Sequence, residues 1–533
     1  MIHSASQPAP PLAAAETRGA SMKKIETESI ARVVDAVKDH VRHHLRCLPV
    51  HEAVSLDAVE GVARDIARRT SEAVFEAWTV VLEELALATA GTCPGCSCVR
   101  KVKRRPGAAM EVCGLGLKVQ VPKLYLECDC GEVGVSITRL LTDLSSGDKS
   151  GELKLMAAYR GAEDSYGKAS RALEVHHGQP IERTAVRRMA LEVEKEALEF
   201  AENERREMLK QAGEERRREG KRQLMETGDG GIVRTGTLVK CARGDPGYGK
   251  KTPKTKRPRR KRPTQCREII NLDVREPGET TASALDVVVP ITAPEGERHR
   301  RMLALAMRKG LGDNTEVYGL GDMGSELAAS FDEAFVGRNP AAIYSADWKH
   351  TSDYVKNAGA LLEGPHPDRW TKSMKSALWN RQRKKADKLI AEARARRVAE
   401  LPHHLQKCPV EVMATYVANN WERFHAKAFK KKGLDYVSAR AESQVRDRIK
   451  SRYSGSGTWK EENLEGKATL RAIIADGRWP VFREYYLRTR REQFAASLAQ
   501  RLRDAVAQGR IRSDVLTRFG VSAASQEPLA AAA

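Results

Sequence analysis

The stretch METGDGGIVRTG, residues 225–236, decides what fold to expect. Its pattern predicts a short strand that ends at Asp229, directly before two glycines. Further strand-like segments lie at 268–274, 282–289, 315–320 and 341–345, and a helical pattern at 297–310 separates the third from the fourth. Strands interleaved with a helix predict a mixed α/β core over residues 223–350.

Two more acids take positions that fit such a core. The segment TEVYGLGD, residues 315–322, ends the fourth strand at Asp322, and a later helix starting near Ser438 carries Glu442. An acid after strand one, another after strand four and a third on a late helix are the arrangement of a ribonuclease-H-like site. Three such carboxylates can hold two Mg²⁺ or Mn²⁺ ions. Singly, an Asp before Gly is usually a turn residue, so the prediction depends on the order of all three.

Four segments carry a resemblance to a known group of enzymes. TGDGG, GLGDMGSEL, SADWKH and ARAESQVRDRIKSRYSGSGTW look like bacterial insertion-sequence transposases of the DDE group, the relatives of Mutator and hAT elements. The resemblance covers roughly residues 90–490. It implies a catalytic, metal-binding trio of Asp229, Asp322 and Glu442, and an all-helical insertion at 351–437. The chain departs from the group where GDMGS replaces the commoner DGA and where a basic run is inserted after the first strand.

A second aspartate competes with Asp322. The group has a Cys/Asp-x2-His motif on the next strand, and this chain has Asp347-Trp348-Lys349-His350 there. We favour Asp322 as the second metal ligand on topology, because it ends the strand after the first long helix. Asp347 and His350 are then a supporting pair that shapes the site or contacts DNA.

Six of the ten cysteines lie between residues 93 and 130. Structural zinc takes four soft ligands in a tetrahedron, and a Cys-Pro-Gly-Cys turn supplies two of them. A later Cys-x-Cys pair supplies two more, which predicts a zinc-ribbon-like domain over 92–149. The second spacing is tighter than usual, two cysteines are surplus, and buried free thiols are the alternative reading. The chosen zinc ligands are Cys93, Cys96, Cys128 and Cys130.

Basic residues mark candidate DNA contacts. GQPIERTAVRRMALEV, residues 178–193, resembles the recognition half of a helix-turn-helix within a helical region at 150–222, although an ordinary helical hairpin has the same pattern. The run KKTPKTKRPRRKRP, inside a basic loop at 240–266, would contact phosphates without sequence preference. In the late helix, α-helical spacing puts two cations on the face of Glu442. The candidates are Arg187, Arg188, Arg257, Arg259, Arg260, Arg446 and Lys450.

Bulk composition agrees with a nucleic-acid partner. The 533 residues carry a formal net charge of +21, with 92 Lys and Arg against 71 Asp and Glu. Such a balance favours a polyanion, here double-stranded DNA, because each neutralised phosphate releases counterions. No apolar run approaches the roughly 20 residues of a membrane-spanning helix, and no signal peptide is evident. We therefore expect no membrane partner and a cytoplasmic, nucleoid-associated protein.

The whole chain reads as an α+β multidomain protein. It would begin with a disordered segment at 1–25 and a helical region at 26–91, followed by the zinc ribbon and the helical DNA-binding region. The ribonuclease-H-like core comes next. Its second part, together with the C-terminal helices, spans 438–510, and a tail follows at 511–533. The resemblance implies a transposase that cuts element ends and transfers the 3′ hydroxyl to target DNA, as a homo-oligomer that pairs two ends. The alternatives are an inactive DNA-binding descendant and a metal-dependent nuclease without strand transfer.

Overall fold

A computed structural model describes residues 56–522 together with residues 35, 38, 39 and 42. Within 56–522 the gaps are 94–95, 105–108, 115–116, 132–133, 143, 145–147, 179, 215–218, 238, 246–259, 262, 280–283, 324–325, 339, 363–365, 397–407 and 454–458. The expected disordered segment at 1–25 and the basic residues Arg257 and Arg259 lie outside the described residues. Arg260 lies in the two-residue strand β8 (Arg260–Lys261), which pairs with β7 (Val239–Lys240).

The chain forms two compact units, and their boundaries differ from the expected domains. The first unit contains residues 1–157, 167–186 and 484–533, and the second contains 158–166 and 187–483. The division falls within four helices, α4 (Gly151–Glu163), α5 (Tyr166–His177), α6 (Arg183–Glu214) and α17 (Trp479–Ala507). In the described parts of the chain, none of the helices combines the length and the apolar character needed to cross a bilayer.

The first unit joins short strands to helices from both ends of the chain. A three-stranded sheet has the order β1 (Lys101–Arg104), β4 (Leu124–Glu127), β5 (Val135–Ser136), and β2 (Met110–Gly114) pairs with β3 (Leu117–Val121). Around them lie α2 (Leu56–Thr89), α3 (Ile137–Thr142), α5 (Tyr166–His177) and α18 (Asp514–Arg518). Leu82, Leu126 and Val515 share one buried cluster. The expected tail at 511–533 therefore begins later, because Ile511, Val515 and Leu516 bury their apolar side chains in this core.

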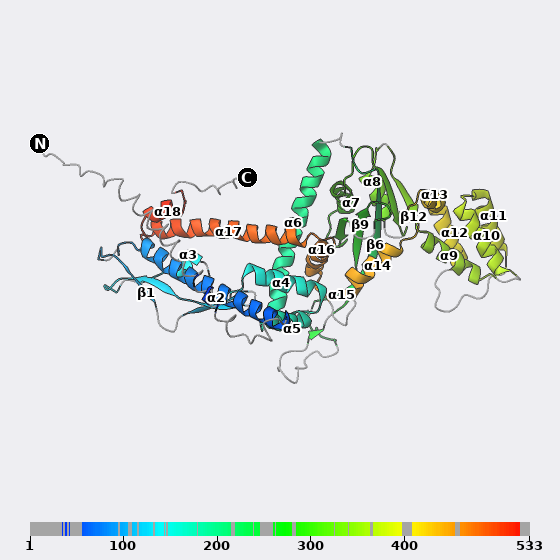
Figure 1. The fold of residues 1–533 in the computed structure, drawn as a ribbon. Helices are drawn as coiled ribbons and strands as arrows, with labels where there is room; N and C mark the ends of the chain where they lie inside the picture. The colour runs from blue at the N-terminus through cyan, green and yellow to red at the C-terminus, as the bar shows by residue number, and fades with distance from the viewer. Residues whose placement is uncertain are drawn as a thin grey trace. The chain divides into compact units, whose positions relative to one another are not determined.

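The second unit is built on a five-stranded mixed sheet, shown in green in Figure 1. Its order is β10 (Ala284–Val288), β9 (Gln265–Arg275), β6 (Gln223–Thr235), β11 (Glu316–Gly321), β12 (Ile343–Ala346). β9 is antiparallel to β6 and to β10, whereas β6, β11 and β12 are parallel. The α+β class is confirmed, and all five expected strands are observed. The prediction that the first strand ends at Asp229 is wrong, because residues 230–235 continue the antiparallel pairing with β9. The ends of the other four strands shift by up to three residues.

Helices cover both faces of this sheet. On one face α7 (Glu297–Arg308) and α8 (Leu327–Ala334) bury Leu305 and Phe331 against Leu272. On the other face lie α14 (Ala439–Val445), the π-helical turn η2 (Arg446–Lys450), α15 (Ser451–Tyr453), the short η3 (Glu461–Asn463) and α16 (Leu464–Ala475). Val445 and Ile449 pack there against Val233 of β6. This packing brings the helix that carries Glu442 onto the sheet.

The described residues between β12 and α14 form a helical body. It consists of α9 (Trp348–Ala360), α10 (Pro367–Trp379), α11 (Arg383–Ala395), α12 (Pro409–Asn420), η1 (Trp421–Arg423) and α13 (Ala426–Lys431). Val355, Met374 and Met413 belong to its own buried core. Phe429 and Leu434 pack against the sheet beside Tyr318 and Leu320.

Candidate metal centres

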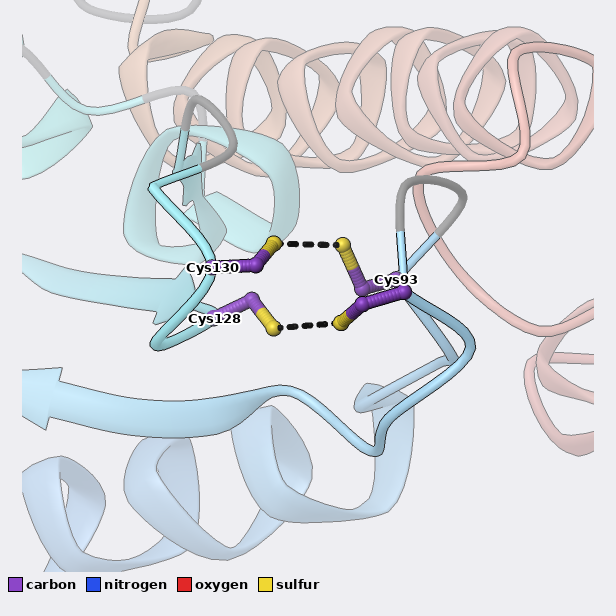
Figure 2. Close-up of side chains that lie close together, drawn as sticks. Cys93, Cys128 and Cys130 are labelled. Atoms are coloured by element: carbon purple, nitrogen blue, oxygen red, sulfur yellow. Dashed lines mark hydrogen bonds between the residues drawn. The ribbon is translucent and has the colours of Figure 1, made fainter.

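The structure brings together the four cysteines chosen from the sequence (Figure 2). Cys93 Sγ lies 3.5 Å from Cys130 Sγ, and Cys96 Sγ lies 3.2 Å from Cys128 Sγ. All four sulfurs lie within 4.8 Å of one another, and all four cysteines are free thiols. A tetrahedral zinc site with Zn–S bonds of about 2.3 Å separates its sulfurs by about 3.8 Å. The cluster therefore has the donors and the size to hold a metal ion, and zinc fits it.

Two tight turns position these thiols. Cys93 donates its backbone N–H to the carbonyl of Cys98 and accepts one from Ser97, each at 2.8 Å. Ser97 has a left-handed φ of 60°. Cys128 and Cys130 follow β4 directly, and Gly131 N donates to the carbonyl of Cys128 at 3.4 Å. The Cys-x-Cys spacing therefore works here because the turn after β4 presents both sulfurs to the first pair.

Cys113, one of the two surplus cysteines, lies elsewhere. It is buried in β2, where Lys149 Nζ donates to its sulfur at 3.2 Å. Cys98 is exposed beside the knuckle and is not among the four converging thiols. The geometry thus selects the same four ligands that the sequence favoured.

In the second unit, three aspartates lie at the same level along three parallel strands. Gly321 of β11 is paired with Gly228 of β6 on one side and with Ala346 of β12 on the other. Each of these three residues is followed by an acid. The acids are Asp229, Asp322 and Asp347.

Strand alternation sets the face on which these acids lie. Residues two apart on a strand project to the same side. Gly231, two residues after Asp229, faces η2 so closely that a Cβ there would lie 2.8 Å from Ile449 Cγ2. Asp229 therefore faces the side covered by α14, and the missing side chain at Gly231 lets that helix approach.

Electrostatics place Asp229 next to Glu442. Burial raises the pKa of the Asp229 carboxyl, and the hydrogen bond from Gly230 N, at 2.8 Å, opposes this shift. The charge of Glu442 raises the pKa further, whereas His350 and Lys450 lower it. A cation bound beside Asp229 would offset the cost of its ionised form.

Glu442 is held by two side chains from the start of α9. Lys349 Nζ donates to Glu442 Oε1 at 2.7 Å and to Oε2 at 2.5 Å. His350 Nε2 lies 3.6 Å from Glu442 Oε1. Ligand atoms of Asp347, His350 and Glu442 all lie within 4.8 Å of one another, so these three could also hold a metal ion.

Asp347 is fully buried and serves two helices. Its Oδ1 accepts hydrogen bonds from the backbone N–H groups of Lys349 and His350, which caps α9. Its Oδ2 accepts from Ser438 N, at 2.6 Å, just before α14. The carboxylate thus fixes where both helices begin relative to β12.

The predicted trio of Asp229, Asp322 and Glu442 does not converge to within 4.8 Å. Among the described residues, the groups of converging metal-ligating side chains are the four cysteines and Asp347, His350 and Glu442. Asp229 and Asp322 belong to neither group, although the register and the electrostatics put Asp229 beside Glu442. The choice between Asp322 and Asp347 as second ligand stays a prediction. Asp347 and His350, expected to support the site, converge with Glu442 to within 4.8 Å.

A buried polar network that sequence reasoning missed positions α14. Asn271, opposite Asp229 in β9, donates to Gln444 Oε1 at 3.0 Å. Gln444 Nε2 donates to Asp273 Oδ2 at 3.1 Å, and Arg275 Nη1 donates to the same oxygen at 2.6 Å. Polar residues inside the apolar strand EIINLDV were the available signal, because buried polar groups need partners.

The cations expected beside Glu442 are placed differently. The π-helical turn interrupts the α-helical spacing, so the expected polar row of Glu442, Arg446 and Lys450 is wrong as a continuous face. Arg446 is exposed, donates to Ser443 Oγ at 3.0 Å and pairs with Asp447 at 3.2 Å. Lys450 is close enough to lower the pKa of Asp229.

The helix expected to contact DNA has the expected two sides. Val186 and Met189 of α6 are buried, and Arg187 and Arg188 are exposed. A DNA contact by these arginines stays a prediction.

Comparison of the chain with protein-family models and with curated proteins finds no match. Function is therefore inferred from the sheet, the two candidate metal centres and the charge.

Proposed function

We propose that the chain is a DDE-type DNA transposase, which hydrolyses a phosphodiester at each element end and uses the freed 3′ hydroxyl to attack target DNA. The observation that carries this proposal is the common level of Asp229, Asp322 and Asp347 on three parallel strands, with Glu442 on the helix that covers the same face. Acids gathered in this way suit phosphoryl transfer through divalent ions.

The strand order supports a ribonuclease-H-like core. Numbered in chain order, the five strands are arranged 3-2-1-4-5, with only strand two antiparallel to strand one among its neighbours. Strands one and four are adjacent and parallel, and Asp229 and Asp322 occupy equivalent positions on them. The ribonuclease-H-like prediction requires this adjacency.

The donor set fits Mg²⁺ or Mn²⁺. Carboxylate oxygens are hard ligands, and His350 adds a nitrogen that Mn²⁺ accepts. Two such ions would activate the attacking hydroxyl and stabilise the leaving oxygen. The protein's own part is to hold the acids: Asp229 by its strand, Glu442 by α14, and α14 by the contacts of Gln444 with Asn271 and Asp273.

The four cysteines and the net charge suit a protein that binds DNA. The four-cysteine cluster would stabilise the short strands around it, as structural zinc does. The net charge of +21 favours phosphate contact over the whole chain. Pairing two element ends in one complex would require at least a dimer.

The deciding experiment is DNA cleavage with Mg²⁺ on a fragment that carries the sequences flanking the coding region. Wild type is compared with Asp229→Asn, Asp322→Ala, Asp347→Ala and Glu442→Gln, and Asp332→Asn on α8 is the matched control. Cleavage by wild type and Asp332→Asn, lost at Asp229, Glu442 and either Asp322 or Asp347, would support the proposal. The second ligand is the aspartate whose variant loses cleavage while it keeps the circular dichroism spectrum of wild type. A wild type that binds the fragment and never cuts it would instead favour the inactive DNA-binding descendant.

Cutting without joining would favour the nuclease alternative. Joining is read by supplying pre-cut ends with free 3′ hydroxyls and a supercoiled target. A transposase relaxes and linearises the target with covalently attached ends, whereas a nuclease leaves the ends unjoined.

A further inference from the structure

Lys349 lies within the acidic centre. It is the second residue of α9, between Asp347 and His350, and its ammonium bonds to both oxygens of Glu442 at 2.7 and 2.5 Å. The ligand atoms of Asp347, His350 and Glu442 lie within 4.8 Å of one another. A cationic side chain therefore lies where three potential metal ligands converge.

This contact resembles the one a bound ion would form. A lysine ammonium is a compact point charge, and a divalent cation binds carboxylate oxygens at about 2.0–2.6 Å. Glu442 cannot present the same two oxygens fully to both, and two cations this close repel each other. Pairing with Lys349 and binding of an ion by Glu442 therefore compete.

We propose that Lys349 holds the place of a divalent cation on Glu442 while no ion is bound, and that it moves to a phosphate oxygen of DNA when the ion binds. The phosphate step rests on the proposed function. The backbone N–H of Lys349 is bonded to the Asp347 carboxylate, so its ammonium moves only within the reach of its four-carbon stem. Within that reach, a DNA phosphate oriented by the ion replaces Glu442 as the anionic partner of the Lys349 ammonium.

The ion pair itself contributes little to the fold, so the position is suitable for mutation. The side chains of Lys349 and Glu442 are 46% and 32% exposed, and exposed ion pairs add little stability. Lys349→Met removes the ammonium and keeps most of the stem. Lys356→Met is the matched control, because Lys356 lies on the same helix and pairs with Asp353 at 3.1 Å.

The first experiment measures Mn²⁺ binding to the zinc-loaded full chain without DNA, by the electron paramagnetic resonance signal of free Mn²⁺. We expect Lys349→Met to bind Mn²⁺ at least fivefold more tightly than wild type, and Lys356→Met to match wild type. In the double variant, Glu442→Gln should remove the gain in Mn²⁺ affinity that Lys349→Met produces. Equal or weaker Mn²⁺ binding by Lys349→Met would overturn the proposal.

The second experiment measures affinity of the zinc-loaded chain for a DNA duplex with Ca²⁺ and without any added divalent cation. We expect Lys349→Met to match wild type without Ca²⁺, where the ammonium is held by Glu442, and to bind at least threefold more weakly in Ca²⁺. An equal loss in both conditions would mean that Lys349 contacts phosphate at all times, and the exchange would be wrong. Neither readout uses cleavage, so a wild type that binds ions and DNA without cutting would refute the proposed function alone.

Discussion

The carboxylate of Asp347 accepts a hydrogen bond from the backbone N–H of Ser438 at 2.6 Å, although 91 residues separate them in the chain. The other oxygen of the same carboxylate caps α9. Asp347 thus joins the starts of α9 and α14, whatever its part in binding a metal ion. This structural duty can be tested by stability as well as by activity.

We expect Asp347→Ala to lower the free energy of unfolding by about 2–4 kcal/mol, because it removes a helix cap and leaves the buried N–H of Ser438 unpaired. Asp353→Ala, which removes an exposed partner of Lys356 on the same helix, is the control and should cost less than about 1 kcal/mol. Urea unfolding followed by circular dichroism measures both. Equal losses for the two variants would show that the contact with Ser438 does not stabilise the fold.

Gly231→Ala tests the approach of α14 to the sheet. The added Cβ would lie 2.8 Å from Ile449 Cγ2 and 3.1 Å from Val445 Cγ1, both on buried, branched side chains. We expect a loss of about 1–3 kcal/mol in unfolding free energy, together with weaker Mn²⁺ binding because Glu442 moves with its helix. Adding Ile449→Ala should recover the Mn²⁺ affinity in the double variant. No recovery would mean that the glycine is not needed for this packing.

Removal of zinc should act on the first unit. With four thiols converging, Cys96→Ser is expected to reduce the zinc content from one ion per chain to a small fraction and to lower the melting temperature of that unit by several degrees. Cys113→Ser, a buried cysteine outside the cluster, should keep its zinc. Metal content by mass spectrometry and hydrogen exchange of residues 92–142 are the measurements, and full zinc content in Cys96→Ser would contradict the assignment.

Glu226 gives a prediction in pH. It is buried on β6, its two carboxylate oxygens have no hydrogen-bond partner among the described residues, and burial, with a smaller effect of Asp273, raises its pKa to about 8. Because this pKa is higher in the folded state than in the unfolded state, protonation of Glu226 stabilises the fold. Stability is lost as pH rises from about 4.5 to about 8, with a slope near 1.4 kcal/mol per pH unit for this group.

Glu226→Gln stays neutral, so its stability relative to wild type should grow between pH 5.5 and pH 8.5 by a few kcal/mol. Urea unfolding at three pH values in that range measures the difference. Glu207→Gln, at an exposed position of α6, is the control and should track wild type. A difference between Glu226→Gln and wild type that is constant with pH would refute the prediction.

The sheet could be predicted from the sequence because its strands are short runs with a clear apolar pattern between turn residues. The strands expected at 268–274 and 315–320 are observed at 265–275 and 316–321, and the helix expected to begin near Ser438 begins at Ala439. The cysteine ligands were equally accessible, since two pairs in tight turns leave few alternatives.

Long-range contacts could not be predicted in the same way. Nothing local to Asp347 indicates the N–H of Ser438 as its partner, and nothing local to Lys349 indicates Glu442. The π-helical turn at 446–450 changes the spacing that a pattern of period 3.6 assumes. The five-residue helix α18 carries too few residues to reveal the core into which Val515 packs.

The contact between Asp347 and Ser438 also means that the chain enters and leaves the helical body at adjoining points. A segment whose two ends meet tolerates changes of length in the parts that do not pack against the rest of the protein. The helical body has a core of its own and contacts the sheet, for example through Phe429 and Leu434. Its outward-facing part can therefore vary in evolution, while the ends of β6, β11 and β12 stay as they are.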